Sequence, residues 1–188
     1  MLAAAEARDW GKADERFQAL LRRADRTEAW LLQATPTDLL AKSEALPLTP
    51  AARRQARERA GLPSGFRQML SVQLLASCEG LPLDEKELDL ILYLVGAHHG
   101  RGRPFAPVVT DANPPDVALT AELLGRPCAL SLTGAERRKS PPHSLDSGVG
   151  ARFWRMQRRY GWWGAAYWKP RCAWPTTRPA PTKSAGPL

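Results

Sequence analysis

The amino-acid sequence predicts an all-α fold with a disordered C-terminal tail. Apolar residues recur at three- and four-residue spacing in segments separated by Gly, Pro and Ser, which is typical of helices that bury one face. Beyond residue 168 the chain has five prolines, no acidic residue and no periodicity, a composition that cannot bury enough apolar surface to fold. We therefore expect a domain over residues 1–168 and a disordered tail over residues 169–188.

Two helices are expected in the first third of the chain. Residues 2–33 carry apolar side chains at helical spacing, and Gly11 interrupts this pattern near its start. Residues 51–60 follow Thr49 and Pro50, which are typical of a helix cap and a first helical position, and they stop at a glycine. Because of Gly11, the segment at residues 2–33 is expected to divide into a short helix and a longer one.

Three further helices are expected in the rest of the domain. Residues 66–77 are apolar on all sides and should be buried. Residues 84–98 are the clearest helix, with acidic residues at the end where the helix dipole favours them. Residues 148–168 return to helix with large aromatic anchors. Between them, residues 117–132 fit either a short helix or a strand, and residues 134–147 are expected to form a loop.

The composition limits the classes of function. The chain has 188 residues and a net charge of +8, which suits a polyanionic partner such as nucleic acid. The excess is confined to residues 134–188, which hold 11 basic and 2 acidic side chains. No apolar run approaches the ~20 residues of a membrane span, and charged residues stand where a signal peptide would be apolar. The three scattered cysteines fit neither a disulfide framework nor a zinc cluster, so we expect a cytoplasmic protein with no membrane partner.

Three groups of residues are candidates for chemistry, and each has a simpler interpretation. Asp9 and Lys12 stand at the helix break, where the alternative is ordinary surface charge. His98 and His99 end a buried helix beside a basic loop, where one histidine can instead cap the helix while the other is solvated. Residues 152–163 interleave arginines with aromatic rings, as in nucleic-acid-binding surfaces, although an amphipathic helix with core aromatics has the same pattern.

The order of these segments resembles one family. Asp9-x-Gly11-Lys12 is similar to the His-Asp-x-Gly-Lys segment of HD-superfamily phosphohydrolases. Residues 62–71 and the string AHHGRGRPF at residues 97–105 resemble one branch, the HD nuclease domain of the CRISPR-associated type I interference helicase-nuclease. Residues 152–164 are similar to the region that precedes that domain's last acidic motif. The resemblance covers about residues 2–168.

This resemblance implies an HD-type helical bundle and a metal-dependent nuclease of antiviral defence that acts on single-stranded DNA. Its cofactor would be a divalent transition metal (Mn, Ni, Co or Fe), and its further partners a CRISPR effector complex or a separate helicase. Carried over onto this chain, the metal ligands would be Asp9, His98 and His99, and the catalytic residues Asp9 and Lys12. The expected DNA contacts are Arg101, Arg103, Arg155, Arg158 and Arg159.

The chain also departs from the family pattern. Arg8 stands in place of the first histidine of the His-Asp doublet, and Gln68 in place of the histidine of an Arg-His-Glu segment. The helicase domains and the final Ala-Asp-His helix have no counterpart. If the reading frame is shifted back by one base at Tyr167, the codons permit Leu-Glu-Ala-Ala-Leu-Arg-Leu-Ala-Asp-His, which would supply the missing helix. We therefore expect residues 169–188 to be out-of-frame sequence.

The incomplete ligand set keeps three functions open. The leading one is an HD nuclease domain whose activity is intact or lost. The second is a non-catalytic basic helical module that binds nucleic acid or an effector complex. The third is an HD phosphohydrolase acting on a small nucleotide.

Overall fold

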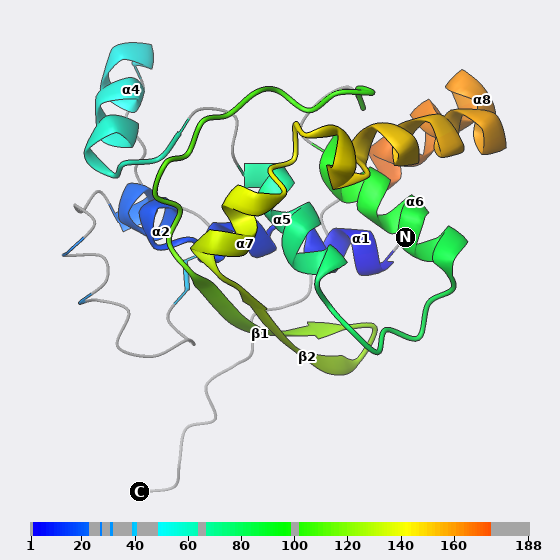
Figure 1. Cartoon of the computed structure of the whole chain (residues 1–188), viewed down its shortest axis with the longest axis horizontal. Helices are drawn as coiled ribbons and strands as arrows, with labels where there is room; N and C mark the ends of the chain where they lie inside the picture. The colour runs from blue at the N-terminus through cyan, green and yellow to red at the C-terminus, as the bar shows by residue number, and fades with distance from the viewer. Residues whose placement is uncertain are drawn as a thin grey trace, which may run out of the picture.

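The computed structural model describes residues 2–22, 39–40, 49–63, 67–98 and 102–173, together with positions 27 and 31. It is mostly helical, and a two-stranded antiparallel sheet lies along one side of the helices (Figure 1). The prediction of a helical fold is therefore confirmed in its main part, and the all-α class is wrong because of the sheet.

The N-terminal segment breaks where Gly11 predicts it. Helix α1 (Leu2–Ala7) is followed by the 3-10 helix η1 (Trp10–Ala13) and by α2 (Glu15–Arg22). The hydroxyl of Ser71 fixes the break, because it accepts a hydrogen bond from the Gly11 N–H (2.8 Å) and donates one to the Arg8 carbonyl (2.9 Å). The Ser71 side chain therefore connects the turn at residues 8–11 with the helix that contains Ser71.

Helix α4 (Pro50–Arg59) begins and ends as its sequence predicts. The Thr49 hydroxyl accepts from the Ala52 N–H (3.2 Å), and the helix stops before Gly61, which adopts a positive φ of 65°. A left-handed conformation of this kind is accessible to glycine at little cost. Most of the helix is exposed.

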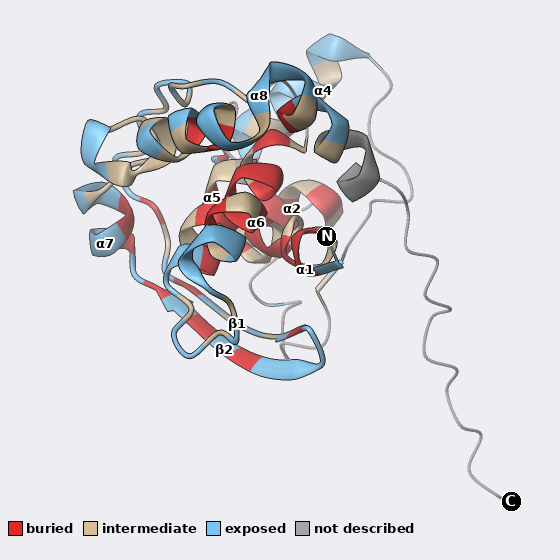
Figure 2. Cartoon of the chain, turned by 90° about the vertical axis from the view of Figure 1, so that its right-hand side faces the viewer, coloured by how far each residue is buried: buried red, intermediate tan, exposed pale blue. Residues whose placement is uncertain are grey.

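Two apolar helices form the centre of the molecule. They are α5 (Arg67–Ala76) and α6 (Glu85–Ala97), and α6 begins with a capping box in which Asp84 accepts from the Glu87 N–H (2.7 Å). Both confirm the predicted segments. Their inward side chains are buried (Figure 2) and belong to one core cluster that includes Leu70, Leu74, Leu75, Leu94 and Val95.

Residues 117–132, whose sequence fits either a short helix or a strand, form a β-hairpin. Strand β1 (Val117–Leu123) pairs antiparallel with β2 (Arg126–Leu132), so that Val117 faces Leu132 and Leu123 faces Arg126. The connecting Leu124 and Gly125 both have positive φ, as a tight two-residue hairpin turn requires. Alternate residues of the two strands pack toward the core, Ala121 among them, whereas Ala118, Thr120, Glu122, Ala129 and Ser131 are exposed.

The expected loop at residues 134–147 contains two short helices instead. Helix α7 (Gly134–Lys139) starts with a capping box between Thr133 and Glu136, and η3 (Leu145–Ser147) follows. A Cβ at position 134 would lie 2.1 Å from the Pro114 carbonyl oxygen, so only glycine allows this close approach.

The last helix, α8 (Val149–Ala173), packs along α6 and bends at Gly161, where φ is 65° and ψ is 177°. It confirms the helix predicted for residues 148–168 and extends into the segment expected to be disordered, so that part of the expectation is wrong. Residues 174–188 of that expected tail lie outside the described residues. Across the described parts of the chain, no helix combines the length and the apolar character needed to cross a bilayer.

Candidate nucleic-acid and metal site

Asp9 lies in the turn between α1 and η1, and two cations flank its carboxylate. Oδ1 lies 2.9 Å from the Lys12 ammonium, and Oδ2 lies 3.7 Å from Nε of Arg8. The Asp9 side chain is 39% exposed and borders a cavity of about 180 Å³ that Lys12 also lines. Asp9 and Lys12 therefore form an ion pair, and the Asp9 carboxylate is accessible from this cavity.

His98 caps the C-terminal end of α6. Its Nδ1 lies 2.5 Å from the Val95 carbonyl oxygen, a geometry in which Nδ1 carries the proton and donates. In that tautomer the lone pair is on Nε2, the nitrogen that a metal would require. The position matches the simpler interpretation of one histidine as a helix cap. His99 and Arg101 lie outside the described residues.

Only some of the predicted metal ligands lie among the described residues. Among the residues that the structure describes, no three His, Cys, Asp or Glu side chains gather closely enough to hold an ion. Of the predicted ligands, only Asp9 and His98 are described, and the cavity at Asp9 is not lined by His98. A divalent ion at Asp9 would also be repelled by the charges on Arg8 and Lys12.

The predicted DNA contact Arg155 is held within the protein. Its guanidinium donates to both oxygens of Asp89, at 2.5 and 2.7 Å, and Arg152 approaches the same carboxylate at 3.3 Å. Burial acts to raise the pKa of Asp89, but the hydrogen bonds from Arg155 and Arg152 outweigh it and lower the pKa. Two guanidinium groups therefore share one carboxylate, which leaves one positive charge in excess.

The outer face of α8 combines exposed aromatic rings with arginines. Trp154, Trp162 and Trp163 are 47%, 65% and 89% exposed, whereas Phe153 of the same helix is buried. Arg158 of the same helix is also exposed. The neighbouring Arg159 lies 5.1 Å over the Tyr160 ring and donates to the Lys86 carbonyl. The helix therefore has both a core side, as the simpler interpretation expects, and an aromatic surface.

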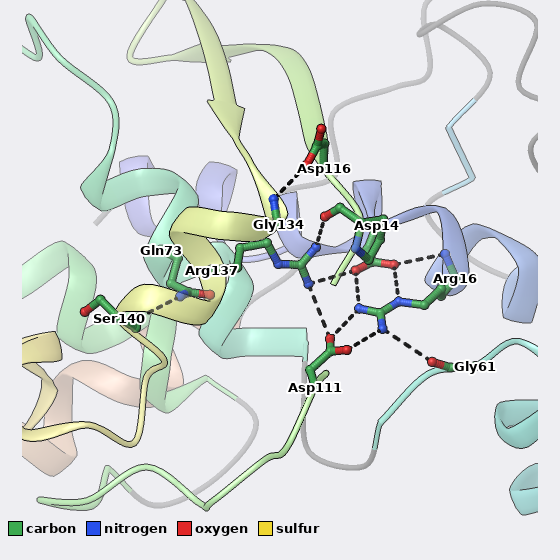
Figure 3. A network of polar contacts seen from close by, with 10 residues as sticks. Asp14, Arg16, Gly61, Gln73, Asp111, Asp116, Gly134, Arg137 and Ser140 are labelled. Atoms are coloured by element: carbon green, nitrogen blue, oxygen red, sulfur yellow. Dashed lines mark hydrogen bonds and ion pairs between the residues drawn. The ribbon is translucent and has the colours of Figure 1, made fainter. Parts of the chain in front are cut away.

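A buried ion-pair network is the feature that sequence reasoning missed (Figure 3). Asp14 is fully buried, and its Oδ2 accepts from Arg16 (2.9 Å) and Arg137 (3.0 Å). Asp111 accepts from Arg16 at 2.8 and 3.0 Å. The two carboxylates balance the two guanidinium groups, so the network holds η1, the loop at Asp111 and α7 together and does not attract an anion.

The two arginines of this network respond differently to burial. Burial acts to lower the pKa of Arg16, but its hydrogen bonds to Asp14 and Asp111 raise the pKa overall. For Arg137, burial dominates and lowers the pKa in spite of Asp14. Arg137 also donates to the Pro115 carbonyl. The spacing of Asp14 and Arg16 is visible in the sequence, but nothing there connects them with residues 97 and 123 positions away from Asp14.

The site as described can hold phosphate groups and aromatic rings on exposed arginine and tryptophan side chains, and it offers Asp9 as an accessible carboxylate. Arg103 is exposed and borders a separate cavity beside α6. No protein-family model, no curated protein and no solved structure matches this chain.

Proposed function

We propose that this chain is an HD-type helical domain of the CRISPR-associated nuclease kind that binds single-stranded DNA and has lost metal-dependent cleavage. The observation that carries the proposal is the environment of Asp9, whose carboxylate is paired with Lys12 and flanked by Arg8. The resemblance of residues 9–18 and 97–105 to that family supplies the nucleic-acid class.

The loss of cleavage follows from the chemistry of the ligand set. A hydrolytic metal centre needs several neutral imidazoles and a carboxylate, held from different helices, to position a metal-bound water against a phosphodiester. Here Arg8 and Gln68 stand where the family pattern has histidines. A guanidinium cannot ligate a metal because it has no lone pair to offer at neutral pH, and its charge opposes a divalent ion.

The retained DNA binding is supported by the exposed side chains. Arg103 and Arg158 are exposed, and Trp162 and Trp163 present ring faces near Arg158 in sequence on the same helix. Guanidinium groups hold phosphates and indole rings stack on bases, which is the combination that single-stranded nucleic acid requires. Arg155 contributes less, because Asp89 already holds it.

Metal uptake and cleavage by the purified full chain test this proposal. The protein is incubated with Mn²⁺, Ni²⁺, Co²⁺ or Fe²⁺, desalted and analysed for bound metal, and then assayed with a labelled single-stranded DNA and with deoxynucleoside triphosphates. We expect no retained metal and no hydrolysis, together with DNA binding that weakens as salt rises. The matched variants Asp9→Ala and His98→Ala/His99→Ala should behave as the wild type.

Two results would replace the proposal by an alternative. Retained metal with DNA cleavage that both variants abolish would show an active nuclease using Asp9 and the two histidines. Hydrolysis of nucleoside triphosphates without DNA cleavage would show a nucleotide phosphohydrolase.

A further inference from the structure

A cavity of about 270 Å³ lies where α6, α8 and the segment at residues 102–107 meet. The segment approaches α6 closely, since a Cβ at Gly102 would lie 2.7 Å from the Tyr93 hydroxyl oxygen. Only glycine permits this approach. The cavity volume equals that of about nine water molecules at liquid density, which is sufficient for a planar ring system.

Three aromatic side chains line this cavity. Tyr93 and Phe153 form its inner wall, with ring centroids 6.4 Å apart and planes inclined by 51°. Phe105 stands at the opening and is 64% exposed. Burial raises the pKa of Tyr93, while a hydrogen bond with Gln157 acts in the opposite direction.

The charged side chains that line the cavity are both positive. They are Arg103, which is exposed, and Arg152, which is half-buried. Arg152 shares the single carboxylate of Asp89 with Arg155, so its charge is only partly balanced. An aromatic cavity with an exposed arginine at its edge and a partly balanced one in its wall is complementary to a planar ring that carries an anionic group.

We infer that this cavity is a subsite for one nucleotide unit of single-stranded DNA, with the base stacked against Phe105 and its phosphate on Arg103. The inference rests on the DNA binding proposed above, and it adds a position for a single base. A free nucleotide offers the same chemistry, so the source of the nucleotide needs its own evidence.

The surroundings of the cavity favour a strand over a free nucleotide. A second hollow of about 150 Å³ shares Phe105 and Val149 with the first and is also lined by Trp154. The ring centroid of Phe153, in the inner wall, lies 5.1 Å from that of Trp154 and 6.0 Å from that of Trp162. The aromatic contacts therefore extend from the cavity wall to exposed indole rings. The next base of a strand would therefore find an aromatic surface beside the first.

Binding of a fluorescein-labelled dT10 decamer and of dTMP to the full chain tests the subsite. Phe105→Ala and Arg103→Gln remove exposed side chains at the opening, and Val108→Ala and Arg126→Gln are matched exposed controls outside the cavity. Thermal unfolding of each variant verifies that the fold is intact. Anisotropy at several salt concentrations gives the dissociation constants.

We expect Phe105→Ala to weaken decamer binding by about 5- to 150-fold, the range for losing one base stack. Arg103→Gln should reduce the salt slope by about 0.7, which is one phosphate contact, and both controls should bind as the wild type. A decamer of abasic sites should bind the wild type and Phe105→Ala equally, because the stacked base is then absent. The decamer should bind far more tightly than dTMP.

Equal decamer binding by the wild type and Phe105→Ala would overturn the subsite, as would the absence of any binding. So would a loss of binding confined to Trp163→Ala on the outer face of α8. Equal affinity for dTMP and the decamer would overturn the strand as its source. Metal-dependent cleavage with the Phe105→Ala effect intact would contradict the proposed loss of activity while leaving the subsite in place.

Discussion

The guanidinium of Arg137 donates to the carboxylate of Asp14 at 3.0 Å, and both side chains are almost completely buried. The contact joins α7 to the turn before α2, across 123 positions of sequence. Arg16 and Asp111 complete the charge balance on the same carboxylates. A buried ion pair stabilises a protein little more than well-packed apolar residues of similar volume would. Removing one partner, however, leaves the other charge buried without compensation.

Replacing Asp14 should therefore destabilise the fold strongly. Asp14→Asn leaves Arg16 and Arg137 buried with Asp111 as their remaining carboxylate. We expect the free energy of unfolding to fall by about 3–5 kcal/mol. Urea denaturation followed by circular dichroism measures it, with an unchanged m-value.

Asp146→Asn is the matched control, because Asp146 is exposed in η3. It should change the free energy of unfolding by no more than ~0.5 kcal/mol. Equal urea midpoints for Asp14→Asn and the wild type would show that the network does not stabilise the protein.

The pH dependence of stability should carry the signature of Asp89. Its pKa is lower in the folded protein than in the unfolded chain, so its ionised form stabilises the fold. This stabilisation is complete above the unfolded value of ~3.9 and is lost as the pH falls through the folded pKa. Asp89→Asn should lower the free energy of unfolding by about 1–3 kcal/mol at pH 7.

The difference between Asp89→Asn and the wild type should begin to narrow as the pH falls below about 4, and it should close only below the lower pKa of folded Asp89, where the group is protonated in both states. Unfolding curves at a series of pH values measure this closure. A difference that stays constant down to acid pH would mean that the carboxylate charge does not contribute.

Most of the helices could be predicted from sequence because they carry their own signals, whereas α7 and η3 lie where a loop was expected. The capping residue Asp84 and the apolar spacing of residues 84–98 are local, and α6 forms where they indicate. The hairpin could not be predicted in the same way. Its strands alternate leucines with small residues, a pattern that a short helix shares, and pairing with a partner strand decides between them.

Restoring a ligand should increase metal affinity. Arg8→His removes the charge that lies 3.7 Å from Asp9 and places an imidazole beside that carboxylate in the sequence. We expect binding of Mn²⁺ or Ni²⁺ to tighten by about tenfold or more, which is ~1.4 kcal/mol. Isothermal titration of the purified chain with each metal measures it.

Arg8→Gln separates the two effects in this experiment, because it removes the charge without adding a ligand. It should bind metal less tightly than Arg8→His. If both variants and the wild type bind equally weakly, Asp9 is not part of a metal position.

The thiol of Cys78 should react slowly at neutral pH. Burial raises its pKa to about 11, and a hydrogen bond with Cys128 acts in the same direction. Because the thiolate is the nucleophile, alkylation by iodoacetamide at pH 7.5 should be on the order of 100-fold slower in the folded chain than in urea. Mass spectrometry of the Cys78 peptide measures the rate, and a folded-state rate equal to that in urea would contradict the burial of this thiol.

Less of the candidate site than of the helices could be predicted from the sequence. The pairing of Asp9 with Lys12 was predictable because three positions of one turn separate them. The binding of Arg155 by Asp89 joins residues 66 positions apart, so only the packing of α8 on α6 reveals it. The cavity beside Phe105 likewise depends on where a loop without regular structure lies.

The long span of the Asp14 network also affects how the chain can fold as it is synthesised. Asp14 leaves the ribosome long before Asp111 and Arg137 exist, so its buried position cannot be completed until most of the domain has emerged. Contacts between such distant residues slow folding and leave early segments exposed to wrong associations. The nascent N-terminal helices should therefore depend on chaperones until α7 has been synthesised.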